Sequence, residues 1–182
     1  MTAMKLYFSP GACSLSPHIV AREAGLPIDL VKTDIRGKTT ANGLNFLDVN
    51  PKGYVPVLEL DDGERLTEGP AIVQYLADQK PASGLAPAAG TMARYRVQEW
   101  LNFISTELHK GFSPLFNPKT PDEYKLIAKE RLTARIAHVA QELGDKQYLF
   151  GEQFTVADAY LFTVLNWTSF VKIDLSAWPV LA

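Results

Sequence analysis

The sequence has one cysteine and three histidines among its 182 residues. A single cysteine, Cys13, excludes an internal disulfide and a metal site built from several cysteines. The histidines, His18, His109 and His138, lie far apart and show no His-Glu-x-x-His spacing, so we expect no metal ion. Cys13 is then either a small buried hydrophobic residue or a reactive thiol, and its surroundings must decide between the two.

Long apolar runs and a surplus of basic residues are also missing. No apolar stretch is long enough for a bilayer-spanning helix. The N-terminus, Met-Thr-Ala-Met-Lys-Leu-Tyr-Phe, passes directly into a strand-like segment without a signal-peptide pattern, so we expect a cytoplasmic protein. With 18 basic and 20 acidic residues, the net charge of −2 argues against a nucleic-acid partner, and we expect no membrane partner either.

The N-terminal part of the chain alternates between strand and helix patterns. Hydrophobic periodicity and turn residues predict strands at 5–8 and 28–32, helices at 14–24 and from Pro70 onward, and a loop with a short helix at 36–49. The segments 57–60 and 64–67 are predicted to form a β-hairpin, with Asp62-Gly63 as a two-residue turn. This order, β-α-β-α-β-β-α, describes a small mixed sheet with a parallel part and an antiparallel hairpin.

The C-terminal part of the chain is predicted to be helical throughout. Segment 81–90, rich in proline, glycine and alanine, is the expected linker. Three apolar stripes with a period of 3.6 residues follow it, over 93–108, 127–143 and 156–167. Thr155 and Asp158 form a capping-box pattern ahead of the third stripe. The predicted fold class is an α/β domain at 1–83 followed by an all-α domain at 90–182.

Cys13 is placed where a thiol can be reactive. It lies at or near a helix N-terminus, after a Pro-Gly loop, where unpaired N–H groups and the helix dipole favour a thiolate. Cys13-Ser-Leu-Ser16 is a monothiol version of the redox Cys-x-x-Cys pattern. Such a thiol could hold a small thiol partner covalently, but it could not complete a redox cycle alone, since Ser16 cannot resolve a mixed disulfide.

Other polar positions allow two interpretations each. The dipeptide Val55-Pro56 marks a strand edge, a special turn or a cis peptide. Glu68 is either an acid that complements a helix dipole or a carboxylate that reaches a cationic ligand. Asn102, Thr106 and His109 are spaced to form one polar stripe on a helix, which is either a solvated face or part of a ligand site. Large aromatic residues of the helical part are expected in the core: Trp100, Phe150, Phe154 and Phe162.

Several longer motifs stand in order along nearly the whole chain. The first is the N-terminal segment Met4-Lys-Leu-Tyr-Phe-Ser-Pro-Gly-Ala-Cys-Ser-Leu-Ser-Pro-His18. Two more are Asn50-Pro-Lys-Gly-Tyr-Val-Pro-Val57 and Leu66-Thr-Glu-Gly-Pro-Ala-Ile-Val-Gln-Tyr-Leu76. The helical part contributes Glu99-Trp-Leu-Asn-Phe103, His109-Lys-Gly111 and Phe154-Thr-Val-Ala-Asp-Ala-Tyr160. Together these motifs resemble the beta-class glutathione transferases of bacteria, the N-terminal segment most closely.

This resemblance implies a fold, a reaction and a set of site residues. The fold would be a thioredoxin-like domain followed by a helical domain, in a homodimer, and the reaction would be conjugation of glutathione to hydrophobic electrophiles, as in detoxification. Cys13 and His109 would be the catalytic residues, and Cys13 could form a mixed disulfide with glutathione. Glutathione, as co-substrate, would be bound by Cys13, Lys38, Val55, cis-Pro56, Glu68, Gly69, Asn102, His109 and Lys110. Trp167 would line the pocket for the second substrate.

Two departures from the family pattern are visible. Gly69 stands where many transferases have a serine, so a side-chain hydroxyl is missing at the γ-glutamyl end of glutathione. The chain also stops at Ala182, where the family continues with a further C-terminal helix, so we expect a truncated C-terminal end. Two alternative functions remain open: a glutathione-dependent disulfide oxidoreductase acting through Cys13, and a non-catalytic protein that binds hydrophobic compounds.

Overall fold

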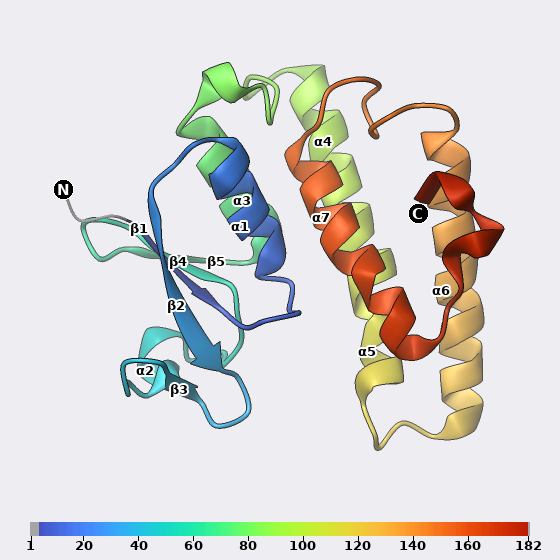
Figure 1. Cartoon of the computed structure of the whole chain (residues 1–182), viewed down its shortest axis with the longest axis horizontal. Coiled ribbons are helices and arrows are strands. Elements are labelled where there is room, and N and C mark those ends of the chain that lie inside the picture. The colour runs from blue at the N-terminus through green and yellow to red at the C-terminus, as the bar shows by residue number, and fades with distance from the viewer. Residues whose placement is uncertain (1–3, 182) are drawn as a thin grey trace. The chain divides into compact units, whose positions relative to one another are not determined.

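The computed structural model describes residues 4–181, and the chain divides into two compact units, Met1–Ala89 and Gly90–Ala182. Figure 1 shows a mixed sheet with helices in the first unit and only helices in the second. The division falls inside segment 81–90, which the sequence analysis assigned to the linker. The α/β and all-helical classes predicted for the two parts are confirmed.

The first unit contains a five-stranded sheet in the order β3-β2-β1-β4-β5. Its strands are β1 (Met4–Phe8), β2 (Ile28–Asp34), β3 (Thr39–Thr40), β4 (Val57–Glu59) and β5 (Arg65–Thr67). The central strand β1 runs parallel to β2 and antiparallel to β4, so the predicted combination of a parallel part and an antiparallel hairpin is confirmed. The short strand β3 was not predicted, since two residues carry no periodicity.

Helices cover both faces of this sheet, because successive side chains of a strand point to opposite faces. Helices α1 (Leu15–Glu23) and α3 (Gly69–Asp78) pack against one another, and Figure 1 shows them on one side of the sheet. The short helix α2 (Phe46–Val49) lies on the other side, where Phe46 packs into a cluster with Tyr7 and Val57. The side chains of Leu6 and Phe46 are fully buried, so both sides of the sheet are part of the core.

The hairpin between β4 and β5 closes differently from the prediction. The loop contains three residues, Asp61, Asp62 and Gly63, because the Leu60 N–H donates to the Glu64 carbonyl at 2.8 Å. Gly63 has a φ of +88°, which glycine adopts without strain. The two-residue turn predicted at Asp62-Gly63 is therefore wrong. A type I turn followed by a left-handed glycine is the usual form of a three-residue hairpin loop, and it has almost the same sequence signal.

The second unit is built from three long helical segments. The first consists of α4 (Met92–Phe103), a π-helical segment at Ile104–His109 and α5 (Lys110–Phe116), which follow one another without a break. The second is α6 (Asp122–Leu143) and the third is α7 (Val156–Leu165), followed by short 3₁₀ turns. Helices α5 and α6 approach closely at Gly111, where a Cβ would lie 3.1 Å from the Leu132 side chain.

The π-helical segment was not predicted, since the sequence shows a continuous apolar stripe through it. Leu101, Ile104, Leu108 and Phe112 are all buried. Ile104, Leu108 and Phe112 are four residues apart, so in a regular α-helix of about 3.6 residues per turn their side chains would move progressively around the helix. A π-helical turn contains more residues, and this keeps the three side chains on one face. The π-segment therefore keeps Phe112 in the core, at the cost of ordinary helical hydrogen bonds.

Helix α7 is buried on nearly all sides. Its capping box is confirmed: Thr155 is the N-cap, its side chain accepts from the first turn, and the Asp158 carboxylate accepts from the Thr155 N–H at 2.8 Å. One core prediction is wrong, because the Phe162 side chain is 57% exposed. Phe162 lies one turn before the exposed Asn166, so the two mark the narrow outer face of the helix.

Among residues 4–181 no helix is long and apolar enough to cross a membrane.

Candidate functional site

Cys13 lies directly before Ser14, the N-cap residue of α1, and is partly exposed. The surrounding loop is closed by side chains: the Ser14 hydroxyl contacts both the N–H and the carbonyl of Ser9, and the Ser16 hydroxyl donates to the Cys13 carbonyl at 3.0 Å. The Cys13 thiol donates to the Val55 carbonyl oxygen, with 3.3 Å between the two atoms. Local hydrogen bonds thus hold the thiol against the segment that precedes β4.

The contact between Cys13 and Val55 belongs to the protonated thiol. A carbonyl oxygen can only accept a hydrogen bond, so a thiolate at Cys13 would give this contact up. The nearby N-terminus of α1 acts in the opposite direction through the helix dipole, which favours negative charge there. Its first N–H groups add little, since Leu15 donates to the Ala12 carbonyl at 3.1 Å, Ser16 donates to the Cys13 carbonyl at 3.2 Å, and Pro17 has no N–H. The thiolate at Cys13 expected from its position before a helix stays a prediction.

Val55 presents its backbone edge beside this thiol. The Val55–Pro56 peptide bond is cis, as the resemblance implied. Pro56 has no N–H to donate, and within residues 4–181 no hydrogen bond reaches the Val55 N–H. A peptide backbone placed alongside could therefore pair with Val55 as a neighbouring strand does.

Glu68 has an unusual backbone conformation at the start of α3. Its φ is +70°, a value that a residue with a side chain rarely adopts and that costs roughly 1–3 kcal/mol. The Glu68 carbonyl accepts from the Ala71 and Ile72 N–H groups, so the residue serves as the N-cap of α3. Strain of this kind persists where the surrounding structure enforces it, and it is concentrated at functional sites.

The Glu68 carboxylate is held by two residues of the segment between α2 and β4. Its Oε1 accepts from the Lys52 ammonium group at 2.8 Å and from the Tyr54 hydroxyl at 2.9 Å. The hydrogen bond to Glu68 raises the pKa of Lys52 and that of Tyr54 above their ordinary values. Since the Glu68 side chain is still 56% exposed, the carboxylate is oriented but remains in contact with solvent.

Gly69 follows as the first residue of α3, where a helix presents N–H groups that have no intrahelical partner. A Cβ built on Gly69 would meet only the Ser16 hydroxyl, at 4.0 Å, and φ at this position is not positive. The backbone and the space thus allow a serine here, although the sequence has none.

Lys38 approaches the same segment from the loop before β3. Its ammonium group donates to the Gly53 carbonyl at 2.6 Å. Asn50, which is 2% exposed, organises this segment from within: its side chain donates to the Tyr54 carbonyl at 2.7 Å and accepts from the Lys52 N–H at 3.1 Å. These hydrogen bonds therefore hold residues 50–54 in shape.

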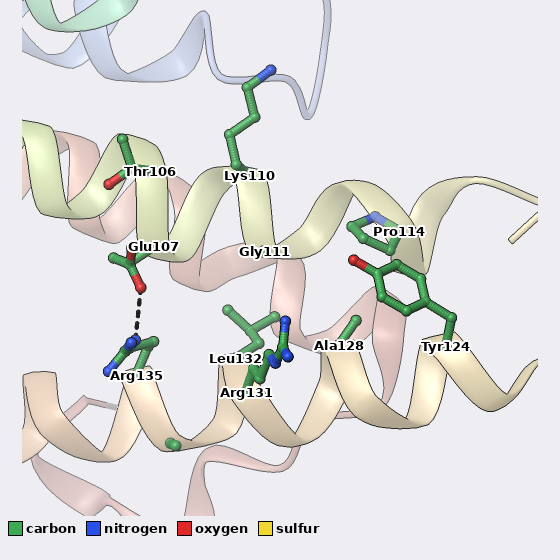
Figure 2. Close-up of a pocket in the computed structure, with 11 residues that line it drawn as sticks. Thr106, Glu107, Lys110, Gly111, Pro114, Tyr124, Ala128, Arg131, Leu132 and Arg135 are labelled. Carbon is green, nitrogen blue, oxygen red and sulfur yellow. Dashed lines mark hydrogen bonds and ion pairs between the residues drawn. The ribbon is translucent and has the colours of Figure 1, made fainter.

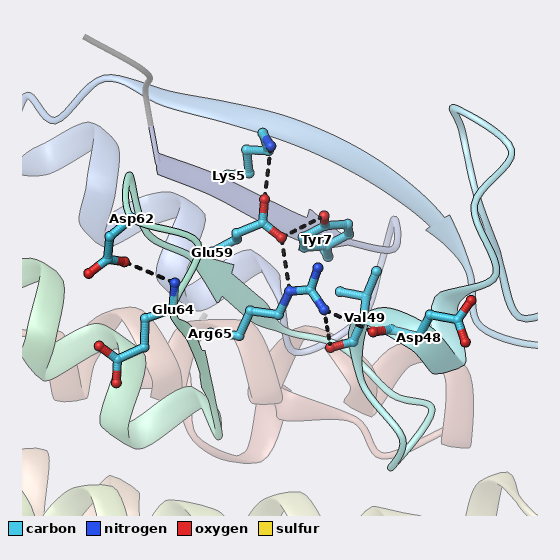
Figure 3. Close-up of polar contacts among 8 residues, drawn as sticks. All are labelled: Lys5, Tyr7, Asp48, Val49, Glu59, Asp62, Glu64 and Arg65. Atoms are coloured by element: carbon cyan, nitrogen blue, oxygen red, sulfur yellow. Dashed lines mark hydrogen bonds and ion pairs between the residues drawn. The ribbon is translucent and has the colours of Figure 1, made fainter.

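A charged network on the sheet is centred on Glu59 (Figure 3). Glu59 accepts from Lys5 at 2.8 Å, from Arg65 at 2.9 Å and from the Tyr7 hydroxyl at 3.1 Å. Lys5 and Arg65 are the cross-strand neighbours of Glu59 in the ladder, so the register itself brings the charges together. Lys5 and Arg65 hold the pKa of Glu59 below its usual range.

The same arginine fixes the end of α2. Arg65 donates to the carbonyls of Asp48 and Val49, at 2.8 and 3.3 Å, where the helix leaves carbonyl groups without internal partners. Because Asn50 follows α2 directly, Arg65 also sets where segment 50–56 begins.

In the second unit, His109 lies among aromatic side chains. It ends the π-helical segment, and its Nδ1 lies 2.6 Å from the hydroxyl of Tyr160 on α7. The Trp167 ring contacts the His109 ring with 4.8 Å between the centroids, and Phe112 and Phe116 contact Trp167 on other sides. His109 and Trp167, predicted as site residues on separate segments, are thus brought together.

Asn102 and Lys110 do not join this aromatic cluster by contacts among the described residues of the unit. The Asn102 side chain donates to the Gln98 carbonyl at 3.0 Å, and the Thr106 hydroxyl donates to the Asn102 carbonyl at 3.0 Å. Both side chains are exposed, whereas His109 is turned towards α7. The single polar stripe expected over Asn102, Thr106 and His109 is therefore only partly formed, since the π-segment changes the direction of His109.

A cavity of about 490 Å³ lies between α5 and α6 (Figure 2). An ion pair between Glu107 and Arg135, 2.7 Å long, crosses it. Lys110 is the one predicted site residue that lines it, and Figure 2 shows the Lys110 side chain pointing away from α6. This cavity therefore does not coincide with the predicted site.

Within residues 4–181, no group of three or more His, Cys, Asp or Glu side chains is arranged to hold a metal ion.

In the first unit, contacts link the predicted residues into a closed ring. Cys13 contacts Val55; Tyr54, next to Val55, contacts Glu68; and Gly69, next to Glu68, lies beside Ser16, whose hydroxyl returns to Cys13. Lys38 contacts the same segment at Gly53.

Sequence reasoning missed three residues that hold predicted site residues in place: Lys52, Tyr54 and Tyr160. All three lie inside the segments that carried the resemblance, but no local pattern pointed to a role. Their partners are between 14 and 51 positions away in the sequence, so only the folded chain reveals the contacts.

Comparison with known proteins agrees with these two units. The family model for the glutathione S-transferase N-terminal domain matches residues 11–79, and the model for the C-terminal domain matches residues 103–182. Glutathione S-transferase GstA of Escherichia coli O157:H7 is 51% identical over 172 residues, which cover 94% of this chain and 86% of that protein.

Two solved structures share the fold at 50% sequence identity. A sphingomonad glutathione S-transferase complexed with glutathione has a TM-score of 0.94, and the bacterial beta-class glutathione S-transferase of Sphingomonas chungbukensis has one of 0.93. Each match covers 97% of this chain and 88% of the other. The chain belongs to the glutathione S-transferase family and is similar to its bacterial beta class.

Proposed function

We propose that this glutathione transferase binds glutathione on its first unit, along the ring of contacts formed by Cys13, Val55, Glu68 and Gly69. That ring is the observation that carries the proposal. In this ring a thiol, a backbone N–H that has no partner within residues 4–181, a carboxylate and a helix N-terminus lie next to one another. These groups complement a tripeptide that has its own thiol, peptide groups, an ammonium group and carboxylates.

Each part of glutathione has a suitable partner in this arrangement. The Val55 backbone would pair with the cysteinyl residue. The Glu68 carboxylate would accept from the γ-glutamyl ammonium group, and the Gly69 N–H would donate to the γ-glutamyl carboxylate at the start of α3. The ammonium group of Lys38 would pair with the glycyl carboxylate at the other end. A 50% identical sphingomonad relative solved with glutathione supports this assignment.

The reaction would be conjugation of glutathione to a hydrophobic electrophile. The bound thiol loses its proton to solvent, its sulfur forms a bond to the electrophilic carbon, and the leaving group departs with the bonding electrons. In the second unit, His109 and Trp167 would line the surface for the electrophile, with Asn102 and Lys110 near it. The aromatic rings around Trp167 suit an apolar substrate.

Cys13, the one thiol in the sequence, is only partly buried, and its exposure favours a second activity. In thiol-disulfide exchange, the Cys13 sulfur attacks a disulfide, the S–S bond breaks, and one half leaves as a thiolate. Free glutathione then attacks the mixed disulfide and releases Cys13. That step yields a mixed disulfide of glutathione with the second half of the substrate, and a second glutathione reduces it to oxidised glutathione and a thiolate. No second cysteine is required, because the two glutathione molecules supply both reducing equivalents.

Cys13→Ser separates the two activities. Conjugation is measured with a chloronitrobenzene, and exchange with hydroxyethyl disulfide in the presence of glutathione. We expect the variant to lose exchange entirely and to retain conjugation within about tenfold, since the serine hydroxyl can donate to the Val55 carbonyl as the thiol does. If the folded wild type performs neither reaction and yet binds hydrophobic compounds, the non-catalytic alternative is correct instead.

We expect a homodimer in the cytoplasm with a role in detoxification, and sedimentation of the purified full chain measures the first of these directly.

A further inference from the structure

Tyr160 lies in the middle of α7 and is 2% exposed. Its hydroxyl is 2.6 Å from Nδ1 of His109. A buried phenol hydroxyl requires a hydrogen-bond partner, and an imidazole nitrogen fills this need. The contact connects α7 to the last residue of the π-helical segment, so two elements far apart in the sequence meet through it.

The orientation of the His109 ring is restricted from two sides. The Tyr160 ring crosses it at 76° with 5.9 Å between the centroids, and the Trp167 ring crosses it at 72° with 4.8 Å between the centroids. Trp167 is itself held by Phe112 and Phe116 at 5.6 and 5.9 Å. A 180° flip of the imidazole would put Cδ2 in the place of Nδ1 and break the contact with Tyr160, so Nδ1 stays directed at the hydroxyl.

The length of the contact indicates which group donates. Hydrogen bonds donated by O–H groups are commonly about 2.5–3.0 Å long, whereas those donated by N–H groups are about 2.7–3.2 Å long. At 2.6 Å, the geometry fits a Tyr160 O–H that donates to an unprotonated Nδ1. A neutral imidazole has one proton, so that proton is then on Nε2.

We propose that Tyr160 is a positioning residue that keeps neutral His109 in the tautomer protonated at Nε2. Nε2 of His109 then carries the proton, so it can act as a hydrogen-bond donor and not as a proton-accepting base. A donor of this kind suits a ligand atom with a lone pair or negative charge, such as a sulfur anion or an electrophile that gains charge during attack. This assignment rests on the proposed function only for the identity of the ligand.

The tautomer is measured directly by nuclear magnetic resonance. The full chain is labelled with ¹⁵N and studied at a pH of about 8, where an ordinary imidazole is neutral. The chain has three histidines, so His109→Gln identifies the His109 signals by their loss. We expect an acceptor-type nitrogen at Nδ1 and an N–H-type nitrogen at Nε2. An N–H-type nitrogen at Nδ1 would overturn the proposal.

Tyr160→Phe removes the hydroxyl and keeps the packed ring. We expect the Nδ1 signal to move towards that of an imidazole without a donor, and kcat for conjugation to fall about 3- to 10-fold, as for the loss of one hydrogen bond. Tyr148→Phe is the matched control, because Tyr148 also contacts another ring, that of Phe154, but lies outside both proposed sites. Its spectrum and kcat should match those of the wild type.

The outcomes separate this proposal from the proposed function. If Tyr160→Phe changes the tautomer but leaves kcat unchanged, the positioning role is wrong. If the Nε2-protonated tautomer is found in a protein that does not bind glutathione, the proposed function fails while the role of Tyr160 in fixing the tautomer stands.

Discussion

Gly69 is the residue at which this chain departs from the pattern of many transferases, which have a serine there. The surroundings of Gly69 leave enough room for a serine side chain. A serine Cβ would meet nothing nearer than the Ser16 hydroxyl at 4.0 Å. The γ-glutamyl carboxylate of glutathione is therefore expected to be bound through the backbone at this position, without a hydroxyl that the fold could accommodate.

Gly69→Ser should tighten glutathione binding. A hydroxyl that donates to a carboxylate contributes about 1.5–3 kcal/mol, so the dissociation constant should fall by about tenfold or more. Calorimetric titration measures this change. Gly69→Ala is the matched control, since it adds the same Cβ without a donor. Equal affinities in the two variants would show that no carboxylate lies beside residue 69.

Glu59 makes the stability of the first unit depend on pH. Its pKa is held below the ordinary value of 4.5 by Lys5 first, with Arg65 and Tyr7 adding to the effect. A carboxyl whose pKa is lower in the folded than in the unfolded chain stabilises the fold above its unfolded pKa. That contribution is lost as the pH falls through the folded pKa.

Glu59→Gln should therefore have a lower free energy of unfolding than the wild type at pH 7. The difference between the two free energies should shrink as the pH falls below about 4.5. Urea unfolding at several pH values measures it. Glu64→Gln, at an exposed position of the same hairpin, should show no such trend. A difference between Glu59→Gln and the wild type that stays constant down to pH 3 would mean that Glu59 is not stabilised by its partners.

At the scale of single residues, the sequence pointed to residues with a distinctive chemistry or backbone, but not to the residues that hold them in place. Cys13 is the only thiol, and Val55-Pro56 and Glu68-Gly69-Pro70 stand at recognisable boundaries of elements. Lys52, Tyr54 and Tyr160 have no such mark, because their importance comes from the atoms they contact. The positive φ of Glu68 was equally invisible, since glutamate has no preference for it.

At the scale of elements, the start of α7 is held by a buried carboxylate. The two oxygens of Asp158 accept from the Leu149 N–H at 2.8 Å, the Thr155 N–H at 2.8 Å and the Thr155 hydroxyl at 2.7 Å. The capping box was readable from Thr155-Val-Ala-Asp158, but the bond to Leu149 was not, because it ties a preceding loop to the helix.

Asp158→Ala should lower the free energy of unfolding by about 3 kcal/mol, because it leaves buried donors without an acceptor. Denaturant unfolding of the full chain tests this. Asp122→Ala is the matched control: Asp122 also lies in the first turn of a helix, but its side chain is 96% exposed and pairs with Lys125 at the surface. Its effect should stay below about 0.5 kcal/mol. Similar losses in both variants would contradict a special role for the buried box.

The π-helical segment shows where element prediction fails for a physical reason. Apolar residues at 101, 104, 108 and 112 read as one helical stripe, and a long helix was correctly predicted there. The extra residue per turn is selected by packing on both sides of the segment: Gly111 meets Leu132 of α6, and His109 meets Tyr160 of α7. Neither contact leaves a periodic signal in the sequence.

At the scale of the whole molecule, two units with different architectures share the chain, and each has its own group of predicted site residues. Alternation between strand and helix patterns, followed by 3.6-residue periodicity alone, was enough to distinguish them. The strand order of the sheet was not predictable from these local patterns, because it depends on which strand edges meet in the folded unit.

The central claim is that glutathione binds to the first unit with its γ-glutamyl group at Glu68. Calorimetric titration of glutathione into the full chain, compared with Glu68→Gln, tests it most directly. We predict one glutathione per chain, and a dissociation constant at least about tenfold higher in the variant, because a neutral amide replaces a charged acceptor. Glu23→Gln, an exposed carboxylate at the end of α1, serves as the control and should bind as the wild type does. Equal binding by Glu68→Gln and the wild type, or no binding by a folded wild type, would contradict the claim.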